Sequence, residues 1–363
     1  MERLSVDSIF SQSLESLQDQ FALWGEPRWR AGQLMEWIYR KFAGGFDECS
    51  NLSKPLRAKL KEKYSFSLAP LITVTGQEHE TRKFLWKLED GNLVESVLIP
   101  AGSEEGGRHT LCVSTQVGCA YGCRFCASGR SGFVRDLTAA EIVGQFLGAE
   151  AWHRRQSGAK DDRLLSNIVV MGMGEPLSNY ENLMRALSII NAPWGGNLGA
   201  RKITISTSGL APQIRRLAGE EPQYRLAISL HAAEDAVRDQ IMPVNRKYPL
   251  NELLAACEAY QRAKGRMISF EYILIDRIND TPHQCDLLAG IARRFHAHVN
   301  LIPFNKVDGC AFRCPPPDVI QGFFAHLQKR GISVTLRQKK GGDINAACGQ
   351  LRLRKMGEGE LSR

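Results

Sequence analysis

The chain has 363 residues, of which 43% are hydrophobic and 24% charged, with 47 Lys and Arg against 39 Asp and Glu. This composition is that of an ordinary globular protein and excludes a disordered, collagenous or coiled-coil chain. No apolar run approaches the ~20 residues that cross a bilayer, and the first residues show no export signal, so we expect a cytoplasmic protein with no membrane partner. The formal net charge of +8 favours a polyanionic partner.

The N-terminal residues 1–75 are predicted to form a small helical domain. Apolar residues recur with helical spacing over 6–23, 29–42 and 56–60, and many Lys and Arg residues stand among Trp29, Trp37 and Tyr39. Such a mixture fits a nucleic-acid platform or a helical bundle with solvated cations. We expect the aromatic residues to pack in the core and some of the cations to contact RNA.

A β-hairpin is predicted within a linker over 76–104. Two runs of alternating polarity lie between Lys83 and Ile99, and Asp90-Gly91 stands between them as a strong turn signal. The hairpin would connect the helical domain to the remainder of the chain.

Residues 105–340 alternate between short β-rich runs and helical stretches. One helical stretch begins at Thr138, and Glu141 three residues later completes a capping box. This alternation favours a parallel sheet that forms a full or partial α/β barrel. The expected strands cover residues 111–115, 167–171, 202–207, 225–229, 270–275, 299–304 and 333–337.

Three cysteines stand in a C-x3-C-x2-C array just after the first of these strands: Cys119, Cys123 and Cys126. Thiolates this close on a turn can converge on one metal centre, and cysteine ligands suit an iron–sulfur cluster or zinc. Three ligands leave a four-coordinate centre incomplete, which suits an iron that binds substrate. His109 or Cys112 could instead complete a zinc site, so both metals remain open on these grounds.

The cysteine array, with aromatic Phe125 before its last member, resembles the signature of the radical S-adenosylmethionine (SAM) superfamily. The resemblance implies an α/β fold built on a partial (β/α)6 radical SAM barrel, together with a 4Fe-4S cluster held by Cys119, Cys123 and Cys126. It also implies that S-adenosyl-L-methionine binds the open iron through its amino and carboxylate groups.

Polar or unusual residues follow several of the predicted strands, at the barrel edge where active residues are expected. Read with the superfamily resemblance, the Gly-Met-Gly-Glu-Pro stretch after the second strand would contact the ammonium group of SAM. Serines and a histidine after the third and fourth strands would contact its ribose or carboxylate, although turn capping alone would also explain the serines. The expected SAM contacts are Gly174, Glu175, Ser206, Ser229, Leu230, His231 and Asn305.

Longer stretches are similar to one family, the radical SAM adenine methyltransferases of ribosomal RNA (the RlmN/Cfr group). They include WRAGQLMEWIYRKF, VESVLIP, LCVSTQVGCAYGCRFCASG, MGMGEPLSNYENL, LAISLHAAEDAVRDQIMPVNRKYPL and GGDINAACGQL, and the resemblance extends over about residues 28–351. Pro176 and the Pro303-Phe304-Asn305 stretch resemble the housekeeping branch, which methylates carbon 2 of adenine rather than carbon 8.

This resemblance implies a reaction that uses two SAM molecules. Cys348 would accept a methyl group and become S-methylcysteine, a radical would activate that methyl group, and its carbon would add to adenine. Cys112 would release the product through a transient disulfide with Cys348, and Glu95 would accept a proton. Residues 341–363 would then form a loop that carries the methyl-bearing cysteine, followed by a mobile tail.

The resemblance further implies 23S rRNA as the substrate, with transfer RNA left open as a second one. We expect a monomer that takes electrons from an external donor such as flavodoxin. Two alternatives remain at this point: another radical SAM enzyme, such as an activase that makes a protein radical, and a non-catalytic zinc module that binds RNA.

Overall fold

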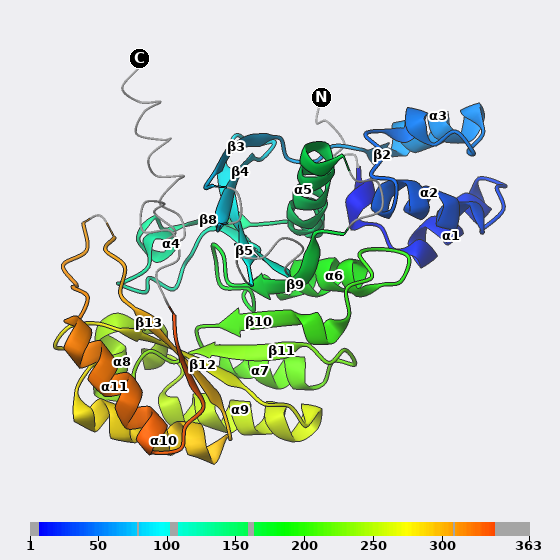
Figure 1. Cartoon of the computed structure of the whole chain (residues 1–363). Helices are drawn as coiled ribbons and strands as arrows, with labels where there is room; N and C mark the ends of the chain where they lie inside the picture. The colour runs from blue at the N-terminus through cyan, green and yellow to red at the C-terminus, as the bar shows by residue number, and fades with distance from the viewer. Residues whose placement is uncertain (1–6, 78–79, 102–107, 159–162, 308, 338–363) are drawn as a thin grey trace.

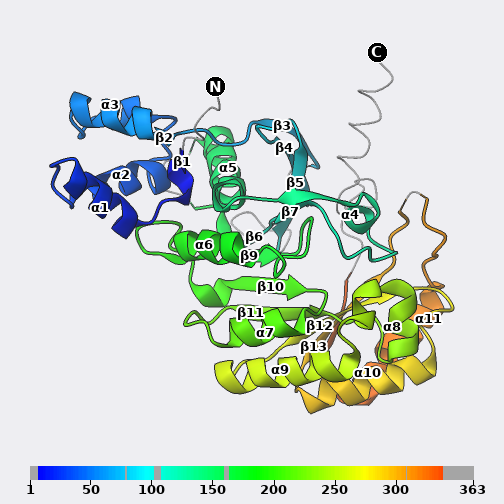
Figure 2. The same cartoon turned by 180° about the vertical axis from the view of Figure 1, so that it is seen from behind.

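The computed structural model describes residues 7–77, 80–101, 108–158, 163–307 and 309–337 (Figure 1). A helical N-terminal part lies beside one end of a large sheet, and further helices pack along that sheet in both views (Figures 1 and 2). None of the helices in these ranges combines the length and the apolar character that a membrane crossing requires.

The N-terminal part is built around α1 (Leu14–Leu23), α2 (Arg30–Tyr39) and α3 (Lys54–Lys63). The helix predicted over 6–23 is wrong in its first half. Ser13 caps α1 in a capping box with Ser16, and the residues before it form strand β1 (Asp7–Ser8) and the short 3-10 helix η1 (Ile9–Ser11). Strand β1 pairs with β2 (Tyr64–Ser65), which joins the two ends of this part.

The expectation that the aromatic residues of this part lie in the core is wrong for one of the three. Tyr39 is buried, and Trp37 is half-buried and donates its indole N–H to Asn51 Oδ1 at 2.6 Å. Trp29 is 60% exposed, because it occupies the N-cap of α2, outside the face on which Leu34 packs.

The predicted hairpin is present as β4 (Arg82–Lys87) and β5 (Leu93–Pro100), and β3 (Leu71–Thr75) joins it as a strand that was not predicted. The Leu88 N–H donates to the Asn92 carbonyl at 2.8 Å, so three residues form the turn, with Gly91 at φ 82°. Lys83 therefore pairs with Val97 and Leu85 with Glu95. Because side chains alternate along a strand, Lys83 and Glu95 lie on the same face.

All seven strands predicted for the barrel are present, and they run parallel to one another. They are β6 (His109–Cys112), β9 (Leu165–Val170), β10 (Ile203–Thr207), β11 (Arg225–Ser229), β12 (Ser269–Leu274), β13 (His298–Pro303) and β14 (Val334–Leu336). Strand β6 also pairs with β5 of the hairpin, which makes one sheet in the order β14-β13-β12-β11-β10-β9-β6-β5-β4-β3. Within the described residues this order is linear, so the barrel is open, as a partial barrel requires.

Helices cover one face of this sheet. For example, Tyr272 of β12 stacks on Phe323 of a C-terminal helix at a centroid distance of 5.7 Å. The capping box predicted at Thr138 and Glu141 is present and begins the helix over Ala139–Ser157. The opposite face of β12 and β13 carries Glu271 and Asn300, which are joined by a hydrogen bond of 2.8 Å. The α-helices of this part are α5 (Ala139–Ser157), α6 (Tyr180–Asn191), α7 (Ala211–Ala218), α8 (Asp235–Ile241), α9 (Leu250–Lys264), α10 (Pro282–Arg294) and α11 (Pro317–Lys329).

Candidate active site

The cysteine loop lies between β7 (Gln116–Gly118) and β8 (Phe133–Asp136), with the short helix α4 (Ala127–Arg130) after it. The Cys119 N–H donates to the Gly132 carbonyl at 2.9 Å, which closes the base of the loop. Gly118 has φ 76°, and a Cβ at this position would overlap that same carbonyl. Only glycine therefore permits the close approach of β7 and β8 that holds the loop.

The thiols of Cys119, Cys123 and Cys126 are free and half-buried. Burial, with a further contribution from neighbouring acidic groups, raises the pKa of Cys119 to about 12, and burial likewise raises the pKa of Cys123. These thiols become thiolates readily only when a metal supplies positive charge.

Within the described ranges no three or more His, Cys, Asp or Glu side chains gather as the ligands of a single metal ion would. In a cubane cluster each cysteine binds a different iron, so the cysteine sulfurs lie farther apart than the ligands of a single metal ion. Three soft thiol donors on one loop fit a 4Fe-4S cluster, and the assignment of the ligands to Cys119, Cys123 and Cys126 stays a prediction.

Contacts from two distant segments hold the cysteine loop. The Arg124 N–H donates to the Ile241 carbonyl at the end of α8 at 3.0 Å, and Arg130 Nη2 donates to the Gly309 carbonyl at 2.8 Å. The Cys310 thiol donates to the Arg124 carbonyl at 3.4 Å. The loop is thus positioned by α8 and by the segment that follows β13.

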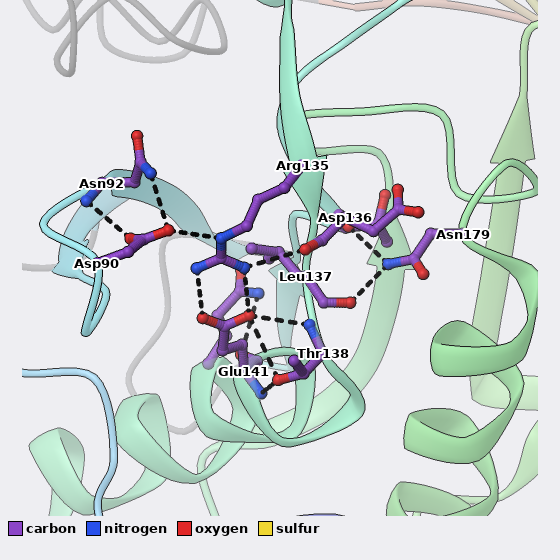
Figure 3. Close-up of polar contacts among 10 residues, drawn as sticks. Asp90, Asn92, Arg135, Asp136, Leu137, Thr138, Glu141 and Asn179 are labelled. Atoms are coloured by element: carbon purple, nitrogen blue, oxygen red, sulfur yellow. Dashed lines mark hydrogen bonds and ion pairs between the residues drawn. The ribbon is translucent and has the colours of Figure 1, made fainter. Parts of the chain in front are cut away.

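Arg135 of β8 connects this hairpin to the rest of the site (Figure 3). Its Nε lies 2.5 Å from Asp90 Oδ2 in the β4–β5 turn, and its Nη1 and Nη2 each lie 2.8 Å from the carboxylate of Glu141 at the start of α5. Asn179 Nδ2 donates to the Thr115 and Leu137 carbonyls on either side of the β7–β8 hairpin. These contacts tie the β4–β5 hairpin, the cysteine hairpin and α5 together.

Gly174 and Glu175 lie in the loop after β9. Gly174 has φ 103°, and a Cβ there would overlap Gln116, whose Oε1 accepts the Glu175 N–H at 2.8 Å. The Glu175 carboxylate is buried and accepts the N–H groups of Leu177 at 3.1 Å and Ser208 at 2.7 Å. Burial raises its pKa, whereas these hydrogen bonds act in the opposite direction.

His231 lies after β11 in the left-handed region, at φ 59°. Its ring packs edge-on against Phe125 of the cysteine loop at a centroid distance of 4.8 Å, and its Nδ1 accepts the Ile273 N–H at 3.0 Å. Burial, with a smaller contribution from Arg238, lowers the pKa of His231 to about 3. The ring is therefore neutral near pH 7.

The remaining predicted SAM contacts also lie at carboxyl ends of parallel strands. Ser206 is buried one residue before the end of β10, Ser229 is half-buried at the end of β11, and Leu230 is completely buried. Asn305 is exposed just after β13. The fold thus brings the loops after β9, β10, β11 and β13 to the same edge, and the contacts themselves stay a prediction.

Arg238 of α8 holds two of these loops and was not singled out in the sequence. Its guanidinium is fully buried and donates to the Leu230 carbonyl at 3.0 Å and to the Ser208 carbonyl at 2.6 Å. An arginine on a short helix normally faces solvent, so the sequence offers no signal for this role.

Glu95 and Cys112 line one small pocket with Val97, Ser114, Gly172 and Met173. Ser114 Oγ donates to the Glu95 carbonyl at 2.6 Å and accepts the Met173 N–H at 2.9 Å, which ties β5 to the loop after β9. The structure thus brings together two residues that the sequence predicts to be catalytic.

Lys83 is a further member of this site that sequence reasoning missed. Its Nζ lies 3.8 Å from Glu95 Oε1, and the side chains are only 2% and 3% exposed. The signal was the hairpin register, which places both residues on one face. A two-residue turn at Asp90-Gly91 would shift the pairing by one position and separate them.

Cys348, the predicted methyl carrier, lies outside the described residues, so its pairing with Cys112 stays a prediction.

Comparisons with known proteins agree with this architecture. Residues 8–65 match the model of the ribosomal RNA large subunit methyltransferase N-terminal domain, and residues 113–284 match that of the radical SAM superfamily. A relative from Akkermansia muciniphila, described as a probable dual-specificity RNA methyltransferase RlmN, is 49% identical over 98% of this chain and 98% of its own length. A dual-specificity RNA methyltransferase RlmN from Pelobacter propionicus is 45% identical over 90% of each chain.

The crystal structure of a radical SAM methyltransferase from Sphaerobacter thermophilus has a TM-score of 0.87 at 43% identity, over 95% of this chain and 98% of that one. The match includes the N-terminal helices as well as the barrel. These findings exclude the activase and the zinc module as alternatives. The chain is a methyltransferase and belongs to the RlmN family of radical SAM RNA methyltransferases.

Proposed function

We propose that the protein methylates carbon 2 of one adenosine in 23S ribosomal RNA. The observation that supports this most directly is the pocket that holds Glu95 beside Cys112, a base and a thiol of the kinds that the reaction needs. Carbon 2 of adenine is electron-poor and has no lone pair, so it cannot displace a methyl group from a sulfonium ion. The words dual-specificity in the relatives' names support a second RNA substrate, which we propose to be transfer RNA.

Cys119, Cys123 and Cys126 would hold the 4Fe-4S cluster, and Gly174, Glu175 and the residues after β10, β11 and β13 would hold SAM. When bound, these groups supply the radical chemistry that a polar route lacks. The neutral His231 and Phe125 pack between the cysteine loop and β12, which excludes water from that side. We further propose an external electron donor such as flavodoxin and a monomeric, cytoplasmic enzyme.

In this proposal Cys348 carries the methyl group as S-methylcysteine, and two SAM molecules are consumed per turnover. Once the carbon has joined adenine, Glu95 accepts the proton that leaves carbon 2. The adduct would give up one electron, which the cluster could take back. The Cys112 thiolate then forms a bond to the Cys348 sulfur, the electron pair of the broken sulfur–carbon bond stays with the transferred carbon, and a proton completes the methyl group. A thiol reductant afterwards restores both cysteines.

Replacing Cys112 by Ala tests the proposal, because the variant can form the covalent intermediate but cannot resolve it. We expect a protein–RNA adduct that migrates as one band and disappears after ribonuclease treatment. Cys257→Ala is the matched control, since Cys257 is a buried core thiol on α9. Full turnover by Cys112→Ala without an adduct would contradict the mechanism.

Mass spectrometry of RNA from a deletion strain tests the substrate. We expect 2-methyladenosine to disappear from 23S rRNA, and from transfer RNA if that assignment holds. An unchanged level in 23S rRNA would refute the proposed substrate. Anaerobic purification should in parallel give about four irons per chain, and fewer after Cys123→Ala.

A further inference from the structure

A second pocket lies on the side of the sheet away from the cysteine loop. It has a volume of about 180 Å³ and is lined by Tyr39, Arg40, Phe42, Glu150, Arg154 and Arg163. These residues come from the end of α2, the second half of α5 and the segment just before β9. Both cartoon views show α2 on the side of the molecule opposite α4 (Figures 1 and 2). The pocket is therefore separate from the site of methyl transfer.

Three guanidinium groups surround this pocket without carboxylate partners. In the described part of the chain, none of Arg40, Arg154 and Arg163 has a carboxylate oxygen within 4.0 Å. They donate instead to carbonyl groups: Arg154 Nη1 to Arg40 at 3.2 Å, Arg40 Nη2 to Pro193 at 2.9 Å, and Arg163 Nη1 to Asn197 at 3.3 Å. Three positive charges thus lie together around one cavity.

The single acid of the pocket is already engaged. Glu150 is buried, and its two oxygens accept the N–H groups of Leu164 at 3.1 Å and Leu165 at 3.0 Å. Its charge offsets at most one of the three arginines. Burial lowers the pKa of Arg163; Glu150 opposes this change, whereas Arg40 and Arg154 add to it. The described residues that line the pocket therefore carry a net positive charge.

Two buried donors in the pocket have no partner. The Tyr39 side chain is 2% exposed and its hydroxyl makes no hydrogen bond, and the Nε of Arg154 is likewise buried and unpaired. Burial raises the pKa of Tyr39, so its hydroxyl remains a donor. Buried polar groups in proteins are nearly always hydrogen-bonded, so two unpaired donors beside three cations indicate a missing acceptor.

We infer that this pocket binds a phosphate group of the RNA backbone. Guanidinium groups match the oxygens of phosphate in a bidentate manner, and the cation at Arg154 stacks over Phe42 at 4.2 Å, which fixes its plane. The assignment to RNA, rather than to free phosphate, rests on the proposed function and on the position of the pocket between the N-terminal helices and α5. A phosphate held there would position the RNA at a distance from the reacting base.

The test measures binding of the full-length protein to a 23S rRNA transcript over a range of salt concentrations. The variants are Arg154→Gln/Arg163→Gln and Tyr39→Phe, which removes only the unpaired hydroxyl. The control is Arg155→Gln, which removes one positive charge from an exposed neighbour on α5. A melting curve with and without inorganic phosphate is recorded for each protein.

We expect the double variant to bind RNA about tenfold more weakly and the slope of log K against log salt to fall by about one. Tyr39→Phe should bind a few-fold more weakly with an unchanged melting temperature in buffer, whereas Arg155→Gln should bind like wild type. If wild type binds but the pocket variants match it in affinity and slope, the inference is overturned. If phosphate stabilises wild type alone while RNA binding is unchanged, the site serves a free phosphate and the RNA assignment is wrong. Failure of wild type to bind RNA would instead contradict the proposed function.

Discussion

A buried lysine and a buried glutamate that lie in contact stabilise each other, because burying either charge alone would cost several kcal/mol of folding free energy. Lys83 and Glu95 are such a pair, 3.8 Å apart beside the thiol of Cys112. The ammonium group lies against the carboxylate and holds it in a buried position. In the proposed reaction this makes Lys83 a positioning residue for the proton acceptor.

We predict that Lys83→Met lowers the methylation rate between about ten- and a hundredfold near pH 7. The carboxylate would lose the ammonium group that holds it beside the thiol of Cys112. Lys83→Arg, which keeps the positive charge, should restore part of the rate, whereas the Michaelis constant for RNA should stay unchanged in both variants. Lys87→Met, on the same strand but exposed, is the control. A wild-type rate for Lys83→Met at pH 7 would contradict this role.

The neutral His231 leads to a prediction about stability and pH. Its pKa is lowered to about 3, below the unfolded value near 6.5, so between these values the unfolded chain binds more protons than the folded one. The free energy of unfolding should therefore fall as the pH is lowered through this window, by up to about 1.4 kcal/mol per pH unit from this residue. His231→Asn, which tolerates the left-handed backbone, should show a shallower decline in urea unfolding at pH 4–7. Equal slopes would show that His231 is not buried in the neutral form.

At the scale of elements, one arginine joins the turn of the β4–β5 hairpin to the start of α5. We predict that Arg135→Gln speeds hydrogen exchange of the β4 and β5 amides and lowers the free energy of unfolding by about 0.5–1 kcal/mol, because the pairs are partly exposed. Arg135→Lys keeps the charge but loses the fork that reaches both carboxylates, so it should give an intermediate result. Exchange in α9, which Arg135 does not contact, serves as the internal reference.

The barrel strands β9 to β13 could be predicted because each is a largely apolar run that is followed along the chain by a helical stretch. Other elements could not be predicted so well. The start of α1 depends on Ser13 rather than on apolar spacing, which continues upstream through Ile9 and Phe10. The pairing of Lys83 with Glu95 depends on a three-residue turn, and Asp90-Gly91 is equally compatible with a two-residue one.

In the candidate site, too, some residues could be predicted from the sequence and others could not. The sequence indicates the cysteine loop, Glu175 and His231 because their residue types are unusual at strand ends. Arg238 and Lys83 are buried cations that act through tertiary contacts, and a cation in a sequence is normally taken for a surface residue. Residues whose type is required by the chemistry could therefore be predicted from the sequence. Residues whose role depends on tertiary packing, such as Arg238 and Lys83, could not.

For the whole molecule, the proposed cluster should contribute to stability as well as to chemistry. The loop that would hold it is fixed by α8 and by the segment after β13, so ligand bonds there would link three parts of the fold. We predict that oxidation and chelation of the iron lower the melting temperature by several degrees and leave the far-ultraviolet circular dichroism nearly unchanged. An unchanged melting temperature, with iron removal verified by metal analysis, would argue against the cluster in this loop.

The hydrogen-bonded ladder that runs from the hairpin into the parallel strands has a mechanical consequence. The carboxylate of Glu95 is on β5 and the thiol of Cys112 is on β6, and these neighbouring strands pair directly through Val97 and Cys112. Their spacing is consequently set by peptide groups and not by any side chain. Single substitutions elsewhere can change how strongly either group reacts, whereas only a change in chain length within the sheet could move one past the other.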